Sequence, residues 1–445
     1  QGMRRIFRVI VRNLAFTNTE LVVNNLDNFL FFGRGDDLMC LFDTPAEESM
    51  LGYVCDVLNE DFKSVTNGYG CSLLAKWMPS INTSSVEARR LAKRFIDYLE
   101  ITPKQYRQML STLRTKIGIV EKYMSANEWD KIDFENLPAK AAMIYSDAFV
   151  KHALNEYTKY LEAVANGDAK VNAGSLFPVD IIHKVIELGG LSWRANKVSL
   201  KDKLLYDAMW KALPNYFGDT EETGICVVDT SGSMNGTPLE VALSLGMYCA
   251  DKAKGPFANH FITFSALPKL QEIKGTDIFD KVAGMQRADW EMNTNLERVF
   301  NLILDTAVAN KLPQEDLPSK LYIISDMQFD EASGQNDTWG SRGKKITFMD
   351  SMKAKFAENG YTMPAIVYWN VRASQCGMFQ QKVDGEDCCM VSGYSASLFK
   401  SVINGTEFVE EVNENGETVI KQKIDPMNVM LTTLNNERYN RVYIG

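Results

Sequence analysis

The sequence has few of the residues that bind zinc or build disulfide frameworks. Its 445 residues include eight cysteines and three histidines, and no two cysteines form a C-x-x-C pair. This spacing excludes the common zinc templates, and we expect reduced thiols. Cys388 and Cys389 are adjacent, and we interpret them as neighbouring strand residues that face opposite sides of a sheet.

Long hydrophobic runs are also missing. The longest, such as residues 321–324 and 365–369, fall far short of the roughly 18 residues that a membrane-spanning helix requires. The first residues lack the charged and apolar segments of a secretion signal, so we expect a cytoplasmic protein without a membrane partner. With 45% hydrophobic and 24% charged residues, the composition is that of a globular protein of two or three domains.

Motifs for nucleotide binding and for serine hydrolysis are absent as well. There is no Walker A loop and no complete G-x-G-x-x-G, so we expect no nucleotide cofactor. A serine hydrolase would need a G-x-S-x-G turn and a partner histidine, whereas Ser233 stands one place early after Gly232. We therefore look for binding chemistry and not for a catalytic triad.

Residues 3–218 are expected to form a mainly α-helical domain. Apolar residues recur at three- and four-residue spacing, and strand-like alternation is scarce. Thr102-Pro103-Lys104-Gln105 has the residues of a capping box with proline at the first helical position. Successive short-linked helices favour a helical-repeat domain of the HEAT type or a bundle. We expect helices at residues 45–59, 84–99, 102–124, 139–165, 178–188 and 198–213.

Residues 219–445 are expected to form an α/β doubly wound domain of Rossmann-like architecture. After residue 218, apolar strand-like runs alternate with helical segments, which is typical of a parallel sheet covered on both faces. The predicted strands cover residues 225–228, 261–264, 321–325, 365–369 and 388–391, and the predicted helices cover residues 238–252, 296–309, 348–358 and 395–403. Residues 406–423, with Asn415-Gly416 at the turn, predict a hairpin insertion.

The most informative residues are Asp229-Thr230-Ser231-Gly232-Ser233, which lie between a predicted strand and the next helix. One carboxylate and two hydroxyls on a tight loop are hard oxygen ligands, which select Mg²⁺, Mn²⁺ or Ca²⁺. Thr294 lies on a polar loop directly before a helix, and Asp326 ends another predicted strand. Ligands of open α/β sheets bind beyond the carboxyl ends of strands, so we expect all five side chains at one edge. Capping of a helix is the alternative role for the hydroxyls.

This order of strand, D-x-S-x-S, threonine before a helix, strand and aspartate resembles the metal-ion-dependent adhesion site of von Willebrand factor A domains. The resemblance implies that Ser231, Ser233 and Thr294 coordinate the metal directly, that Asp229 and Asp326 act largely through water, and that a partner's carboxylate takes an open position. The motifs at residues 325–330, 365–371 and 391–395 are similar to those of a family that joins such a domain to a helical domain like the TROVE module of Ro autoantigens. The match covers most of residues 138–445, and it implies a ribonucleoprotein component.

The helical region has a local excess of positive charge. Residues 86–123 carry nine basic and four acidic side chains, and Arg4, Arg5, Arg8 and Arg12 add a basic start. Tyr98 and Tyr106 are candidates for stacking on unpaired bases. Solvated helix faces show the same pattern, which is the alternative interpretation. The candidate RNA-binding residues are Arg89, Arg90, Lys93, Arg94, Lys104, Arg107 and Arg114.

The sequence therefore predicts a non-enzymatic binding scaffold. In this hypothesis the helical domain holds a small structured RNA, and the metal site, with Mg²⁺ or with Mn²⁺ or Ca²⁺, recruits an acidic protein. The first alternative is a protein-only adaptor that uses the metal site alone. A metal-dependent nuclease is a further alternative, but such enzymes gather more carboxylates and histidines around the ion than this site offers.

Overall fold

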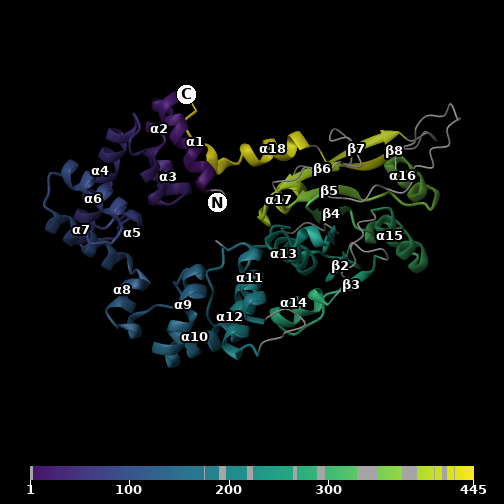
Figure 1. The fold of residues 1–445 in the computed structure, drawn as a ribbon. Coiled ribbons are helices and arrows are strands. Elements are labelled where there is room, and N and C mark those ends of the chain that lie inside the picture. Colours follow the sequence, from purple (N-terminus) through teal and green to yellow (C-terminus); the bar gives the residue numbers. More distant parts are fainter. Residues whose placement is uncertain are drawn as a thin grey trace. The chain divides into compact units, whose positions relative to one another are not determined.

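The structure is a computed structural model of the chain, shown in Figure 1. It describes residues 4–174, 176–189, 197–217, 224–263, 268–287, 296–327, 348–372, 388–404, 406–412, 418–424 and 426–444. Two compact units are present, and each is described by itself. Unit 1 contains Gln1–Asp133, Lys151–Ala153 and Asn435–Gly445, and unit 2 contains Phe134–Val150 and Leu154–Leu434.

The two units do not divide at the predicted boundary of residue 218. Helix α11 (Pro178–Gly189) packs against α13 (Thr237–Lys252) and α14 (Ile278–Gln286), so part of the helical sequence joins the C-terminal fold. Ile181, Ile182 and Val185 supply the buried face of α11. Apolar burial between these helices explains why the compact units differ from a division by secondary-structure type.

Unit 1 is built from short helices around one apolar core. Helix α4 (Glu47–Thr66) lies at its centre, buries Met50, Val54 and Leu58, and packs against α6 and α7. The remaining elements are α1 (Arg4–Thr17), α2 (Thr19–Val23), α3 (Leu26–Phe32), η1 (Gly35–Leu41), α5 (Leu74–Trp77), α6 (Val86–Tyr98), α7 (Pro103–Ile117), α8 (Val120–Ser125), η2 (Trp129–Lys131) and η5 (Glu437–Tyr439).

The start of α7 confirms the predicted capping box. The Thr102 hydroxyl accepts the Gln105 N–H at 3.3 Å, and Gln105 Oε1 accepts the Thr102 N–H at 2.8 Å. The predicted end near residue 124 is wrong, because Gly118 adopts a left-handed conformation with φ 70° and ends the helix. Glycine takes this conformation without a side-chain clash, and the chain restarts as α8.

The segment after residue 435 returns to α2 and α3 of unit 1. The Asn25 side chain donates to the Tyr443 carbonyl at 2.8 Å and accepts the Tyr443 N–H at 2.9 Å. Arg441 forms an ion pair with Asp27, and its guanidinium lies 4.0 Å from the centre of the Phe31 ring. We call residues 436–443 the return segment.

Unit 2 combines four helices with an α/β fold. The predicted helix over residues 139–165 is instead two helices, α9 (Ala139–His152) and α10 (Leu154–Asn166). The further helices are α11 and α12 (Leu200–Lys211), then α13, α14, α15 (Leu296–Asn310), α16 (Phe348–Glu358), α17 (Ser397–Asn404) and α18 (Pro426–Leu434), with short turns η3 (Gly232–Met234) and η4 (Gln314–Asp316). Within the described ranges, no helix has the length and apolar character that crossing a membrane requires.

One six-stranded sheet forms the centre of unit 2, in the order β3-β2-β1-β4-β5-β6. All neighbouring strands are parallel except β3, which pairs antiparallel with β2 at the edge. Strand order reverses between β1 and β4, so their carboxyl ends flank a switch point where such sheets bind ligands. The strands are β1 (Gly224–Val228), β2 (His260–Thr263), β3 (Leu270–Glu272), β4 (Lys320–Ser325), β5 (Ala365–Asn370) and β6 (Cys388–Ser392).

Helices cover both faces of this sheet (Figure 1), which confirms the predicted α/β layering. On one face Ile225 and Val227 pack with residues of α15 and α16 in a continuous apolar core. On the other face α13 packs on β1, and Phe399 of α17 meets the rings of Tyr322 and Trp369 at 4.9 and 4.7 Å. Sequential strands joined by helices dictate this arrangement.

The predicted hairpin forms a separate two-stranded antiparallel sheet. Strand β7 (Thr406–Val412) pairs with β8 (Thr418–Ile424), with Val412 opposite Thr418. The predicted Asn415-Gly416 turn lies outside the described residues. The described cysteines, including Cys388 and Cys389, are free thiols, as expected.

Candidate functional site

The D-x-S-x-S loop leaves the carboxyl end of β1 at the switch point. The Asp229 N–H donates to the Ile324 carbonyl at 3.0 Å, which holds the start of the loop against β4. Asp229 Oδ1 accepts the Ser231 N–H at 2.9 Å, so the loop folds back on its own carboxylate. Met234 is fully buried and anchors the other end. The loop is therefore fixed from both sides.

The two loop hydroxyls lie side by side. Ser231 Oγ and Ser233 Oγ are 3.1 Å apart, and both side chains are partly exposed. Adjacent ligands of an octahedral Mg²⁺, each about 2.1 Å from the ion, lie about 3.0 Å apart. The spacing of these hydroxyls thus fits two neighbouring positions on one cation.

Asp326 brings a second carboxylate to this edge from the end of β4. Its side chain is fully buried. The next residue, Met327, has φ 66°, and its N–H donates to Ser325 Oγ at 3.0 Å. A methionine in the left-handed region marks a sharply turned backbone at the switch point, of the kind that often occurs at binding sites.

Burial sets the electrostatics of Asp229. Its side chain is inaccessible, and burial raises the pKa of its carboxyl above the usual range. Hydrogen bonds from Ser325 and Ser231 oppose this rise, whereas the negative charge of Asp326 adds to it. Two carboxylates held in one poorly solvated place favour a nearby positive charge.

The structure brings together Asp229, Ser231, Ser233 and Asp326 of the predicted metal ligands. Thr294, the fifth, lies outside the described residues. Hydroxyl and carboxylate oxygens are suitable donors for Mg²⁺ or Mn²⁺. In the part of the chain that the structure describes, there is no group of three or more histidine, cysteine, aspartate or glutamate side chains that could hold a metal ion.

Most of the predicted RNA-binding arginines on α6 make contacts inside unit 1. Arg90 pairs with Glu87 at 2.8 Å and with Asp43 at 3.3 Å. Arg94 pairs with Asp43 at 3.2 Å and with Glu47. These ion pairs neutralise the face that the sequence presents as a positive patch.

Two further predicted arginines donate to backbone carbonyls. Arg89 donates to the Thr83 carbonyl at 2.8 Å. Arg114 donates to the carbonyls of Ala75 and Met78 at 2.9 and 2.7 Å, and burial lowers its pKa. Both guanidiniums therefore hold the chain between α5 and α6, which sequence alone does not reveal.

The basic start of the chain shows the same pattern. Arg4 and Arg8 form ion pairs with the buried Asp37 of η1. Arg12 donates to the Cys40 carbonyl at 2.9 Å. Arg5 is exposed, whereas Arg4, Arg8 and Arg12 are partly buried, so the sequence overstates the free positive charge of α1.

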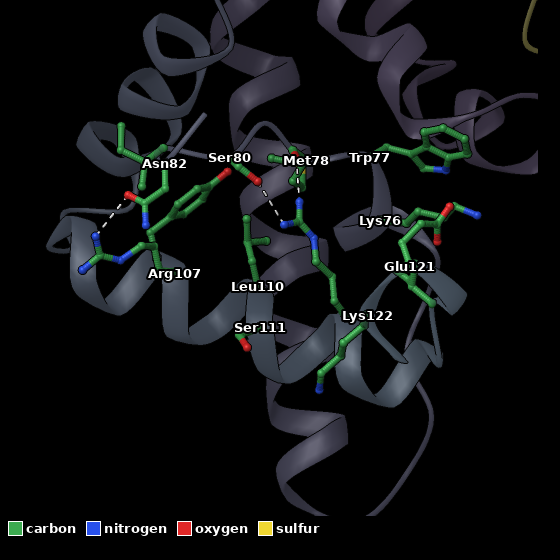
Figure 2. Close-up of a pocket in the computed structure, with 14 residues that line it drawn as sticks. Lys76, Trp77, Met78, Ser80, Asn82, Arg107, Leu110, Ser111, Glu121 and Lys122 are labelled. Atoms are coloured by element: carbon green, nitrogen blue, oxygen red, sulfur yellow. Dashed lines mark hydrogen bonds between the residues drawn. The ribbon is translucent and has the colours of Figure 1, made fainter. Parts of the chain in front are cut away.

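A pocket of about 670 Å³ lies between α5, α7 and α8 in unit 1 (Figure 2). Arg107 lines one end and donates to Asn82 Oδ1 at 3.2 Å. Lys122 and Lys76 line other parts of the pocket (Figure 2). Arg114 also lines it and donates to Ser80 Oγ at 3.0 Å. Lys104 and Lys93 are exposed on the same unit. The pocket is lined by Arg107 and Arg114 of the predicted RNA-binding residues. It is also lined by Lys76 and Lys122, which are not among those predicted residues.

One predicted stacking residue is excluded by its position. Tyr106 is fully buried, and its hydroxyl donates to the Pro79 carbonyl at 3.0 Å. The prediction that it stacks on a base is wrong, because α7 turns this ring into the core. Tyr98 is 43% exposed. Trp77 also lines the pocket, and its ring contacts the Arg34 guanidinium at 4.0 Å.

Two family models match the chain, one on each part. Residues 223–434 match a family described as Domain of unknown function (DUF7788), and residues 53–217 match Domain of unknown function (DUF2828). The two matches meet near residue 220, where the predicted boundary lies.

A similar protein is the Uncharacterized protein L728 of Acanthamoeba polyphaga mimivirus. It is 32% identical over 411 residues, which are 88% of this chain. The chain spans 66% of the length of that viral protein.

Two solved structures show distant similarity to the chain. The Ro (RSR) protein of Deinococcus radiodurans has a TM-score of 0.39 and 11% sequence identity, with 88% of this chain and 84% of that chain covered. Proximal thread matrix protein 1 from the mussel byssus has a TM-score of 0.30 and 14% identity, with 44% and 50% covered.

Proposed function

We propose that the α/β fold of unit 2 binds one divalent cation, Mg²⁺ or else Mn²⁺ or Ca²⁺, and uses it to hold an acidic group of a partner protein. Ser231 and Ser233 would coordinate the cation directly, and Asp229 and Asp326 would act largely through water. Thr294 remains the predicted fifth ligand. The observation that carries this proposal is the 3.1 Å pair of hydroxyls beside two buried carboxylates at the switch point.

The choice of ligands favours binding over catalysis. Neutral hydroxyls leave more of the ion's charge uncompensated than a shell of carboxylates does, so the ion attracts an external anion. The arrangement is similar to that of the adhesion site of von Willebrand factor A domains, in which a partner supplies the carboxylate. We accordingly propose that the protein is a non-enzymatic scaffold.

Thermal stability in the presence of Mg²⁺ tests the cation site. A ligand that binds only the folded state raises the Tm in proportion to the logarithm of its concentration once it exceeds its Kd. We expect Ser231→Ala with Ser233→Ala to remove the Mg²⁺-dependent rise and to keep the fold in metal-free buffer.

A second pair of serines provides the matched control. Ser395 Oγ and Ser397 Oγ are 2.7 Å apart and also two residues apart in sequence, at the start of α17. Ser395→Ala with Ser397→Ala should leave the Mg²⁺-dependent rise unchanged. An equal rise in the Ser231/Ser233 double variant would overturn the proposed site.

A second function, RNA binding by unit 1, is favoured by the pocket. Arg107, Lys122 and Lys76 surround a cavity of about 670 Å³, in the size range of small-molecule sites. Cationic side chains of this kind bind phosphates, and the neighbouring Trp77 offers an aromatic surface for a base. We propose that this pocket, and not the ion-paired face of α6, makes the principal contact with a small structured RNA.

Titration of a labelled hairpin RNA at two salt concentrations tests this function. Binding through phosphates weakens steeply as salt rises, because counterions are released on binding. Arg107→Glu with Lys122→Glu should abolish binding at low salt, whereas Arg90→Gln, on the ion-paired face, should reduce it less than twofold. Absence of binding by the unmodified chain at low salt would favour the protein-only adaptor. RNA cleavage that requires metal and is lost in Asp229→Ala would instead support the nuclease alternative.

A further inference from the structure

The loop that follows β5 places an arginine at the rim of the candidate cation site. The Val371 N–H donates to the Ser325 carbonyl at 3.1 Å, which continues the pairing of β5 with β4. The Arg372 N–H donates to Asn370 Oδ1 at 2.8 Å. These two bonds fix the backbone from which the Arg372 side chain extends.

The Arg372 guanidinium lies between two parts of the site. It donates to the Ser233 carbonyl, and Nη1 lies 3.7 Å from Asp326 Oδ2. The distance to Asp326 exceeds that of a hydrogen bond, so the guanidinium is not held there in a close bidentate pair. The side chain is 38% exposed, whereas that of Asp326 is fully buried. Arg372 therefore touches the site and still faces solvent.

The charges around the site explain what this arginine adds. When ionised, Asp229 and Asp326 together cancel the two charges of a divalent cation. The guanidinium of Arg372 contributes one further positive charge beside them. With the cation bound, Arg372 raises the net charge of the site by one unit, which strengthens the attraction of the site for an anion.

We propose that Arg372 is the anion-recognition residue of this site, and that its ligand is a carboxylate side chain of a partner. One carboxylate oxygen binds the cation, and the guanidinium, which presents several N–H donors in a fixed plane, holds the other. The inference rests on the proposed cation site and goes further, since it names a residue of this chain that recognises the partner's carboxylate.

Two separate measurements on the full chain test this proposal. Mn²⁺ binding is measured by electron paramagnetic resonance, and binding of a fluorescein-labelled hexaglutamate peptide is measured by fluorescence anisotropy at saturating Mn²⁺. We expect Arg372→Gln to bind Mn²⁺ at least as tightly as the unmodified chain, because a repelling charge is gone. Its affinity for hexaglutamate should fall at least tenfold. Arg372→Lys keeps the charge without the planar donors, so its affinity for hexaglutamate should lie between those of the unmodified chain and of Arg372→Gln.

Arg287→Gln is the matched control. This arginine follows the last residue of α14 in the same unit and donates to the Ala283 carbonyl at 3.0 Å, so both affinities should stay unchanged. Mn²⁺ binding with equal hexaglutamate affinity in Arg372→Gln would overturn this proposal and leave the cation site standing, as would an unmodified chain that binds Mn²⁺ but no hexaglutamate. Failure of the unmodified chain to bind Mn²⁺ would overturn the cation site and this proposal with it.

Discussion

Ser325 Oγ donates a hydrogen bond to Asp229 Oδ2 at 2.5 Å, and both side chains are fully buried. The bond joins the carboxyl ends of β1 and β4 at the switch point of the sheet. The same hydroxyl accepts the Met327 N–H at 3.0 Å, so one serine orients the first carboxylate and fixes the backbone beside the second. The geometry of the candidate site depends on this residue, although it is not a predicted ligand.

Ser325→Ala should therefore weaken both the fold and the cation site. It removes a hydrogen bond to a buried carboxylate, and such bonds contribute about 2 kcal/mol. We expect urea denaturation to show a free energy of unfolding that is lower by about that amount, together with a smaller Mg²⁺-dependent rise in Tm. Ser395→Ala is the control. A change in stability no larger than that of the control would contradict the role assigned to Ser325.

Arg8→Gln should destabilise unit 1. Arg8 Nε lies 2.7 Å from Asp37 Oδ1, and the Asp37 side chain is 4% exposed, so the change leaves a buried carboxylate with less compensation. Breaking a buried pair costs about 3 kcal/mol or more, and we expect about 2 kcal/mol because Arg8 is partly exposed and Arg4 also pairs with Asp37. Arg5→Gln, on the exposed side of α1, should have no effect on the urea midpoint. Equal midpoints for the two variants would refute this expectation.

Cys40 should react slowly with iodoacetamide at neutral pH. Burial raises the pKa of its thiol to about 11, and the thiolate is the reactive form. Relative to a thiol of pKa 9.0, its thiolate fraction at pH 8 is about a hundredfold smaller. The rate should rise with pH through about 11, and peptide mapping by mass spectrometry follows it. Glutathione serves as the reference thiol, and a Cys40 rate within tenfold of it at pH 8 would show that the thiol is not protected.

Arg441→Ala should release the return segment from unit 1. The change removes the ion pair with Asp27 and the contact with the Phe31 ring. We expect chymotrypsin to cleave after Tyr439 several times faster in this variant than in the unmodified chain. Ile444→Ser, at a side chain that is 86% exposed, should leave the cleavage rate unchanged. Equal rates for both variants would mean that Arg441 does not hold the segment.

Sequence reasoning works best where a local pattern decides the structure. The capping box at Thr102 and the strands that lead to Asp229 and Asp326 depend on neighbouring residues and on apolar runs, and the structure has them where expected. Strand β3 has three residues and only one apolar side chain, so it is too short for an alternation of apolar and polar residues to predict it. Edge pairing with β2, which is a long-range contact, creates it.

Long-range partners of charged residues are beyond such reasoning. The sequence pattern does not reveal the acidic partner of Arg94, because Glu47 lies 47 residues away along the chain, on α4. The sequence does not identify Arg372 as a site residue, because its partner Ser233 lies 139 residues away along the chain. The spacing of basic residues predicts how much positive charge a region has, and only the fold shows how much of it remains available.

Because the return segment belongs to unit 1, this unit begins to be synthesised before unit 2 but is completed after it. Helices α2 and α3 are made before the return segment, so Asn25 can form its hydrogen bonds with Tyr443 only after a further 418 residues have been made. During translation domains generally fold from the N-terminal side, so unit 1 starts first and is completed after the sheet has been made. Until then Phe31 and Asp27 lack their contacts with Arg441, so this surface of unit 1 stays incomplete in the nascent chain.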